Sequence, residues 1–236
     1  MRVLAHRPHL ESLLRSPRLA FVSPSRAAPP WPALASTGIA ALDALLGGGI
    51  PRGHLTEIVG ARSSGRTGVL LALLAHATRH GELAALVDAG DALDPTSAAK
   101  AGVELDRLLW VRCGGDFQKA LRAADLIARG GGFGLVALDL ADLPGEAIAR
   151  VPLSAWLRLS RAVEGSSTAL VLLGSERSAG SFAALAVAIR PRRIRWAGEP
   201  SSPGLLRGLE AEAHLVRARW WGRGRVAAAC PLHFVR

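Results

Sequence analysis

The sequence predicts an α/β fold: a doubly wound, mainly parallel sheet with helices on both faces, extended by antiparallel strands near the C-terminal end. Between residues 55 and 173, short apolar runs alternate with stretches of helical periodicity. Continuous apolar runs are typical of parallel strands that are covered on both faces, and their alternation with helices is typical of a doubly wound domain. Residues 186–235 instead alternate apolar and basic side chains, which predicts antiparallel strands with one buried and one solvated face.

The composition is that of an ordinary globular protein with a strong positive charge. The chain has 236 residues, of which 50% are hydrophobic, and a formal net charge of +10. The charge indicates a polyanionic partner, nucleic acid above all. Lys100 and Lys119 are the only lysines, so the arginine excess also matches the codon bias of a GC-rich genome. Cys113 and Cys230 stand in apolar runs and are expected to be buried thiols. Without a signal-peptide pattern or a membrane-length apolar run, we expect a cytoplasmic protein with no membrane contact.

Two regions are expected along the chain. Residues 1–35 form an N-terminal arm, with a short helix at 8–16 and a proline-rich connector at 23–32. The arm either folds along the domain or docks on a neighbouring subunit or partner, with Trp31 as the anchor. Residues 36–236 form the core domain.

The elements of the core are predicted from periodicity and turn residues. Ser36 and Thr37 are expected to cap a helix at 39–46, which ends at three consecutive glycines. A strand at 55–59 leads through a glycine-bounded loop into a helix that runs to about residue 79. Later strands are expected at 83–88, 108–113, 135–139, 168–173, 186–196, 211–220 and 225–235, and helices at 95–101, 116–129 and 153–163.

The loop at residues 60–67 is the feature that bears most directly on function. Gly60, Gly65 and Thr67 match the phosphate-binding pattern G-x-x-x-x-G-K-[ST], but Arg66 stands where the pattern has lysine. Strand, loop and helix are the context in which this pattern cradles phosphates.

Several separated motifs resemble the bacterial RecA recombinase core in order and spacing. They lie at residues 36–43, 47–53, 55–60, 63–67, 87–95 and 102–109, and the likeness continues more weakly through 135–139 and the terminal strands. The resemblance implies a RecA-like fold, with the Thr67 hydroxyl on Mg²⁺ and Asp139 in the metal's water shell. The candidate nucleotide-binding residues are therefore Gly60, Ser63, Ser64, Gly65, Arg66, Thr67 and Asp139.

Four positions depart from that family's catalytic pattern. Arg66 replaces the loop lysine, Gly90 the water-activating glutamate, Ser97 the base-stacking tyrosine, and Gly174-Ser175 the sensor asparagine-glutamine pair. Asp91 is adjacent to Gly90, but a shift of one residue points its side chain elsewhere. Because losing one catalytic group commonly costs ~10²–10⁴ in rate, we predict a pseudo-ATPase rather than an enzyme. We therefore expect no catalytic residue, no metal site of the protein's own and no required cofactor; ATP with Mg²⁺ is the ligand that the loop would take.

Arginines and tryptophans gather near the C-terminal end and are the candidate contacts to DNA or a partner protein. Single-stranded DNA, a protein interface and a plain solvated strand face are the alternatives for this surface. The stretches at 140–146 and 174–181, which correspond to the family's DNA-contacting loops, are short, so threading of DNA through a filament is not expected. The candidate residues are Arg190, Arg192, Arg193, Arg195, Arg217, Arg219, Trp220, Trp221 and Arg223.

A shortened RecA-like chain with a proline-rich arm and a basic end resembles the ImuA group, the RecA-like accessory proteins of bacterial mutagenesis cassettes. The resemblance implies a role in SOS mutagenesis and translesion synthesis. The implied partners are an inactive Y-family polymerase homologue, an error-prone polymerase and the RecA recombinase, whose recombination the chain would restrain; self-association stays open. The alternatives are a DNA-stimulated ATPase of recombinase type with a variant loop and a SulA-like cell-division inhibitor.

Overall fold

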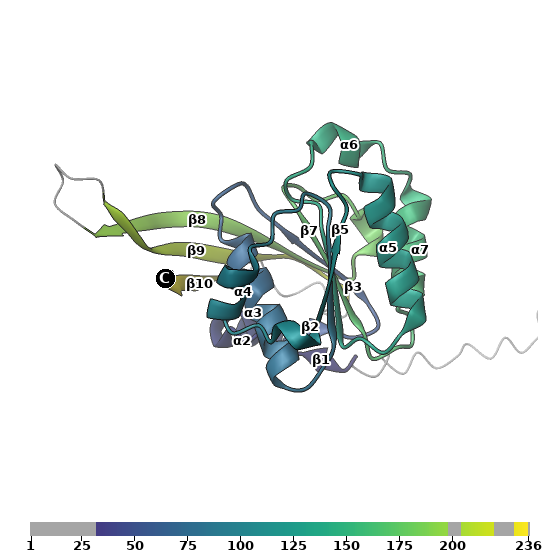
Figure 1. The fold of residues 1–236 in the computed structure, drawn as a ribbon, viewed down its shortest axis with the longest axis horizontal. Coiled ribbons are helices and arrows are strands. Elements are labelled where there is room, and N and C mark those ends of the chain that lie inside the picture. Colours follow the sequence, from purple (N-terminus) through teal and green to yellow (C-terminus); the bar gives the residue numbers. More distant parts are fainter. Residues whose placement is uncertain (1–31, 198–203, 220–228, 236) are drawn as a thin grey trace, which may run out of the picture. The chain divides into compact units, whose positions relative to one another are not determined.

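The computed structural model describes residues 32–197, 204–219 and 229–235 (Figure 1). The helix predicted at 8–16 and nearly all of the proline-rich connector lie outside the described residues. The predicted boundary between residues 35 and 36 therefore stays a prediction. Leu34–Ala35 form a short strand, β1, that pairs antiparallel with β2 (Ile50–Pro51).

The main sheet has eight strands in the order β10-β9-β8-β3-β7-β6-β4-β5. The strands from β3 to β8 run parallel, while β9 and β10 are antiparallel to their neighbours. The predicted fold class is confirmed in this respect. The strands are β3 (Leu55–Val59), β4 (Ala84–Asp88), β5 (Leu108–Arg112), β6 (Leu135–Asp139), β7 (Ala169–Gly174), β8 (Leu185–Ala197), β9 (Leu205–Ala218) and β10 (Ala229–Val235).

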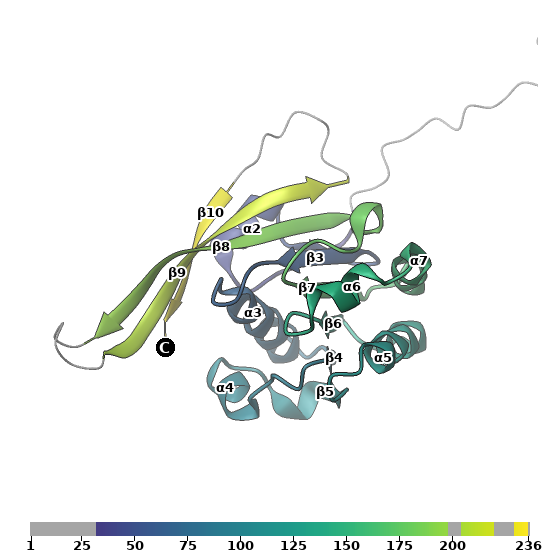
Figure 2. The same ribbon diagram turned by 90° about the horizontal axis from the view of Figure 1, so that it is seen from above.

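Helices cover both faces of the parallel part of the sheet (Figures 1 and 2). Alternate strand residues divide into two buried clusters, so that Leu86 joins one and its neighbour Val87 the other. This is why most residues of these strands are apolar. The first cluster takes in α2 (Ala40–Leu46), α3 (Arg66–Arg79) and α4 (Pro95–Lys100), and the second α5 (Phe117–Gly130), α6 (Gly145–Ala149) and α7 (Leu153–Ala162).

Some local features differ from the prediction. The short helix α6 was not predicted, and β9 begins at Leu205 rather than at residue 211. The prediction that Ser36 and Thr37 cap the N-terminus of α2 is wrong. The N-cap residue is Ile39, and no side chain forms the capping hydrogen bond there. Instead the Asp43 carboxylate accepts hydrogen bonds from the Ser36 hydroxyl (2.6 Å) and the Thr37 N–H (2.8 Å).

Strands β8 and β9 extend beyond the parallel sheet as a long ribbon, and β10 pairs with β9 along part of it (Figure 1). Strand β8 pairs with β3 only over residues 185–188, whereas it pairs with β9 along its whole length. Irregularities in register between Ala186 and Val187, between Pro191 and Arg193, and between Arg195 and Trp196 interrupt the ladder. Such bulges bend strands and increase their twist.

The carboxyl ends of the parallel strands meet at one edge of the sheet, next to the loop that follows β3. Asp88 at the end of β4 lies directly opposite Asp139 at the end of β6. Ligands of open α/β sheets bind at this edge, so a ligand-binding site is expected there.

Candidate nucleotide-binding site

The loop between β3 and α3 depends on two glycines. A Cβ on Gly60 would lie 2.4 Å from the Ser64 Oγ and 2.7 Å from the Ile189 carbonyl oxygen, so no larger residue fits there. Gly65 has a φ of +97° immediately before α3 begins at Arg66, a conformation that favours glycine. The loop thus leads directly into a helix N-terminus, a place where anions bind.

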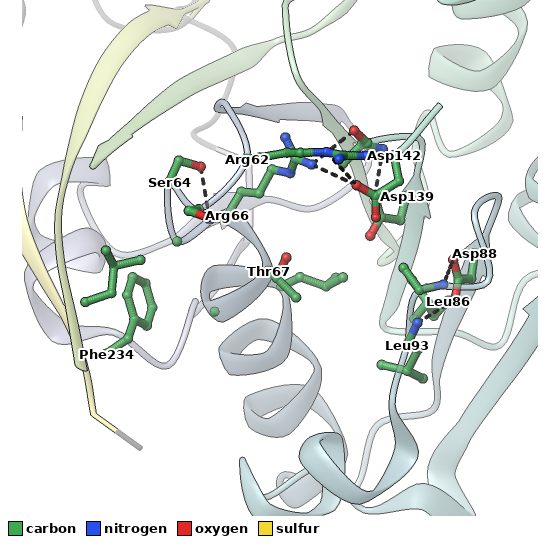
Figure 3. Close-up of a pocket in the computed structure, with 17 residues that line it drawn as sticks. Arg62, Ser64, Arg66, Thr67, Leu86, Asp88, Leu93, Asp139, Asp142 and Phe234 are labelled. Carbon is green, nitrogen blue, oxygen red and sulfur yellow. Dashed lines mark hydrogen bonds and ion pairs between the residues drawn. The ribbon is translucent and has the colours of Figure 1, made fainter. Parts of the chain in front are cut away.

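A cavity of about 510 Å³ opens at this loop (Figure 3). The Thr67 side chain is exposed in it. The predicted residue Gly60 belongs to the loop but does not line the cavity. The predicted residues that line it are Ser63, Ser64, Gly65, Arg66, Thr67 and Asp139.

Arg66 is held by protein acceptors rather than left free for a ligand. Its side chain is 6% exposed. One guanidinium nitrogen donates to the Gly60 carbonyl, and the other donates to the Ala141 carbonyl at 3.0 Å and lies 3.5 Å from the Asp142 carboxylate. A planar fork can bond several acceptors at once, which a lysine ammonium cannot reproduce in the same geometry. Arg66 therefore ties the phosphate-binding loop to the segment after β6.

Asp88 and Asp139 lie among the cavity's lining but differ in their environment. The buried Asp88 carboxylate accepts hydrogen bonds from the Ala92 and Leu93 N–H groups and from the Trp110 indole. Asp139 accepts the Ala141 N–H at 2.9 Å. Burial, with the nearby charges of Asp88 and Asp142, raises the pKa of Asp139 to about 6, against the lowering effect of the Ala141 hydrogen bond and Arg66.

The residues at the cavity fit a magnesium ion that arrives with nucleotide phosphates. Mg²⁺ is commonly bound through one or two protein oxygens together with phosphate oxygens, rather than by an all-protein cage. Thr67 offers an exposed hydroxyl, and a cation would offset the burial and the neighbouring carboxylates that raise the pKa of Asp139. Within the described ranges, no group of three or more His, Cys, Asp or Glu side chains could hold a metal ion alone.

The positions that depart from the family pattern lie in different surroundings. A Cβ on Gly90 would lie 3.3 Å from the Asp142 Cβ. Asp91 is turned away and accepts the Cys113 and Gly114 N–H groups. The Ser97 hydroxyl donates to Asp94 at 2.6 Å.

Asp142, Leu209 and Phe234 line the cavity but were not predicted as site residues. The Phe234 ring lies within 2.6 Å of the places that a Cβ on Gly65 or Gly68 would occupy, so β10 packs on the start of α3. Nothing local in the sequence indicates this contact, because it depends on the pairing of β10 with β9. For Asp142 a signal existed, an acidic residue closely following the strand-end Asp139.

The predicted basic residues do not form one patch. In the register of the ribbon, Arg217 lies opposite Ala186, whereas Arg193 lies opposite Glu210. At ~3.3 Å per residue, the strand between Ala186 and Arg193 spans about 23 Å. Trp220, Trp221 and Arg223 lie outside the described residues.

Acidic side chains on β9 neutralise part of this charge. Arg192 pairs with Glu212 at 2.8 Å, and Arg195 pairs with Glu210. Arg190 and Arg193 are exposed, and among the described residues neither makes an ion pair. Arg219 donates to the Ser181 carbonyl at 3.2 Å.

Comparisons with known proteins find the same likeness to RecA in part of the chain and the same fold in a solved structure. Residues 33–148 match the family model of the RecA N-terminal domain. The chain is 39% identical to Protein RecA of Methylococcus capsulatus over 156 residues, 60% of this chain and 45% of that protein. It is 46% identical to Protein RecA of Clavibacter michiganensis over 108 residues, 45% of this chain and 30% of that protein. The chain thus spans less than half the length of these relatives.

A solved structure, that of the RadB recombinase, shares the fold. The TM-score is 0.61 with 20% sequence identity, covering 84% of this chain and 94% of the RadB chain. The predicted RecA-like fold is therefore confirmed. In the part of the chain that the structure describes, no helix is long and apolar enough to cross a membrane.

The prediction that the chain is a pseudo-ATPase and not an enzyme is wrong. The proteins to which it is similar are named Protein RecA and RadB recombinase, and nothing among them indicates a pseudoenzyme. The physical error was to judge each catalytic position by its own residue. A side chain from another segment can occupy the same space, as Asp142 does beside Gly90.

Proposed function

We propose that the chain is an ATPase of recombinase type that binds ATP and Mg²⁺ at the loop between β3 and α3 and serves the DNA-damage response. In this proposal the loop's backbone N–H groups hold the phosphates, and the Thr67 hydroxyl and Asp139 hold the metal. Mg²⁺ would neutralise charge on the phosphates as the terminal phosphoryl group is transferred to water.

The observation that carries the proposal is the preserved geometry of the loop. Gly60 and Gly65 occupy positions where space and backbone conformation favour glycine. The loop leads into the 14-residue helix α3 and opens on a cavity of about 510 Å³ that also contains Thr67 and Asp139. Arg62, whose side chain is 83% exposed, lines the same cavity and supplies an exposed positive charge, whereas Arg66 is buried.

The test is ATP binding and hydrolysis by the whole chain, with and without single-stranded DNA. The variant Thr67→Ala removes the hydroxyl at the cavity and should lower turnover by about 10²-fold or more, since a metal ligand is lost. Thr96→Ala is the matched control, because Thr96 is exposed on α4 and does not line the cavity. Hydrolysis that is equal in the wild type and in Thr67→Ala would refute the proposal.

We further propose that the activity serves translesion synthesis, as in the ImuA-type group, through contacts with a polymerase-like partner or the RecA recombinase. The observation that favours this role is the far end of the β8–β9 ribbon. Trp196 is 63% exposed there and pairs in register with Leu206, while Leu205 is 70% exposed opposite Ala197. Large apolar side chains beside arginines are typical of protein interfaces.

The contact is tested with the purified inactive Y-family polymerase homologue and, separately, the recombinase. Leu205→Ala should weaken binding by about 5- to 30-fold, as expected for a contact worth about 1–2 kcal/mol. Leu126→Ala is the matched control, because Leu126 on α5 is 72% exposed and lies away from the ribbon. Equal affinities for the two variants would exclude the ribbon end as the interface.

Direct DNA binding is a separate part of the proposal and would rest on Arg190 and Arg193. A complex driven by phosphate contacts weakens steeply as salt rises, and each lost contact lowers the slope of log affinity against log salt by about 1. Arg193→Gln should therefore reduce that slope for single-stranded DNA. Arg192→Gln should change it less, because Arg192 already pairs with Glu212.

A further inference from the structure

The cavity at the phosphate-binding loop contains a carboxylate that no proposed role yet uses. ATP hydrolysis requires a group that orients the attacking water and accepts its proton. Such a group must line the cavity, be accessible to water and have a free acceptor oxygen. The acidic residues that line the cavity within the described chain are Asp88, Asp139 and Asp142.

Two of these three carboxylates already have other partners or roles. Asp88 is 1% exposed, and its two oxygens accept backbone N–H groups and an indole N–H. Asp139 is partly buried, accepts the Ala141 N–H and is the residue that fits the metal. Asp91, which follows β4, is directed to the end of β5 and does not line the cavity.

Asp142 differs from them in exposure and in its neighbours. Its side chain is 41% exposed, and its Oδ1 lies 3.5 Å from the Arg66 guanidinium and 3.9 Å from the Arg62 Nε. Figure 3 shows it on the same side of the cavity as Asp139, with both arginines directed toward it from the loop. Both guanidinium groups lie on the Oδ1 side of the carboxylate and attract it electrostatically.

The space that Asp142 occupies is the space beside Gly90. A Cβ on Gly90 would lie 3.3 Å from the Asp142 Cβ, and Gly90 is not among the residues with positive φ. The backbone at position 90 therefore does not need a glycine. A carboxylate could reach this part of the cavity from either segment, and in this chain the segment after β6 supplies it.

We infer that Asp142 is the catalytic carboxylate of the proposed ATPase, an inference that rests on the proposed function. Asp142 accepts a hydrogen bond from a water molecule and takes its proton as the water oxygen bonds to the γ-phosphorus. The bond from the γ-phosphorus to the β–γ bridging oxygen breaks, and ADP leaves with the electron pair. The products are ADP and inorganic phosphate, and the proton passes from Asp142 to solvent.

The test compares Asp142→Asn with the wild type in the whole chain, measuring ATP affinity and turnover separately. Turnover should fall by about 10²–10⁴, while the affinity for ATP should change by less than about 3-fold. Asp106→Asn is the matched control, because Asp106 is an exposed aspartate that does not line the cavity. Its turnover should equal that of the wild type.

A second variant separates catalysis from a purely structural role in holding Arg66. Asp142→Ala combined with Gly90→Glu removes the partner of Arg66 but returns a carboxylate to the same space. Turnover well above that of Asp142→Ala alone supports catalysis. No recovery, with a lowered unfolding midpoint and weakened ATP binding in both variants, would assign Asp142 to structure and overturn the inference.

The outcomes also separate this inference from the proposed function. If Asp142→Asn hydrolyses ATP as fast as the wild type does, the inference about Asp142 is overturned, while the proposed ATPase activity stands. ATP binding by the wild type without any turnover would overturn the ATPase, and the role of Asp142 with it.

Discussion

Replacing Arg66 by lysine restores the usual residue of the phosphate-binding motif, yet we expect the protein to become less stable. The Arg66 guanidinium is buried and donates to the Gly60 and Ala141 carbonyls beside Asp142. A lysine ammonium cannot span these acceptors, so at least one buried carbonyl loses its partner. Hydrogen bonds to charged groups contribute ~1.5–3 kcal/mol each, so Arg66→Lys should lower the free energy of unfolding by about 2–4 kcal/mol.

The assay is urea unfolding and thermal unfolding of matched variants. One kcal/mol corresponds to ~2–4 °C in a domain of this size, so the midpoint of Arg66→Lys should fall by about 5–15 °C. Arg62→Lys is the control in the same loop, because the Arg62 side chain is 83% exposed and surface substitutions cost ~0.5 kcal/mol or less. Equal midpoints, with a change in ATP affinity confined to Arg66→Lys, would show that Arg66 serves a ligand rather than the loop.

Two further predictions concern Gly65 and Asp139. Gly65→Ala should lower the free energy of unfolding by about 1–3 kcal/mol more than Gly81→Ala, since both glycines have positive φ but only a Cβ on Gly65 would meet Phe234 at 2.6 Å; equal losses in urea unfolding would contradict the contact. Asp139 has a pKa of about 6 in the folded chain, against 3.8 for the ordinary side chain. The folded state therefore binds the Asp139 proton more tightly than the unfolded state does. This stabilises the folded state fully below about pH 4, and the stabilisation is lost as the pH rises through about 6. A shift of one pKa unit corresponds to ~1.4 kcal/mol, so the free energy of unfolding should fall by up to about 3 kcal/mol as the pH rises through this range. Asp139→Asn should abolish this pH dependence, whereas Asp106→Asn should retain it.

The sequence was sufficient to predict the parallel strands and the helices between them. Each strand from β3 to β7 is a short apolar run bounded by turn residues, and such local patterns survive in the fold. Gly60 and Gly65 could also be predicted, because the loop pattern fixes their spacing. Phe234 could not, because its contact with α3 depends on the long-range pairing of β10 with β9.

The chemistry of the site was harder to predict than the fold. Gly90 indicated a missing carboxylate, but the sequence could not show that Asp142, from another strand's loop, lies beside it. Likewise the identity of residue 66 did not reveal that the Arg66 guanidinium donates hydrogen bonds to two backbone carbonyls. The basic residues were counted together, although strand register separates Arg217 from Arg193. Such errors arise wherever the relevant neighbours come from distant segments.

The proposed activity requires that the loop between β3 and α3 supports turnover of ATP. The decisive measurement is the release of inorganic phosphate from ATP by the whole chain with single-stranded DNA and Mg²⁺, beside Thr67→Ala. We predict phosphate release that DNA stimulates, that Thr67→Ala reduces by about 10²-fold and that Thr96→Ala leaves unchanged. Release that is absent from the wild type, or equal in the wild type and Thr67→Ala, would contradict it.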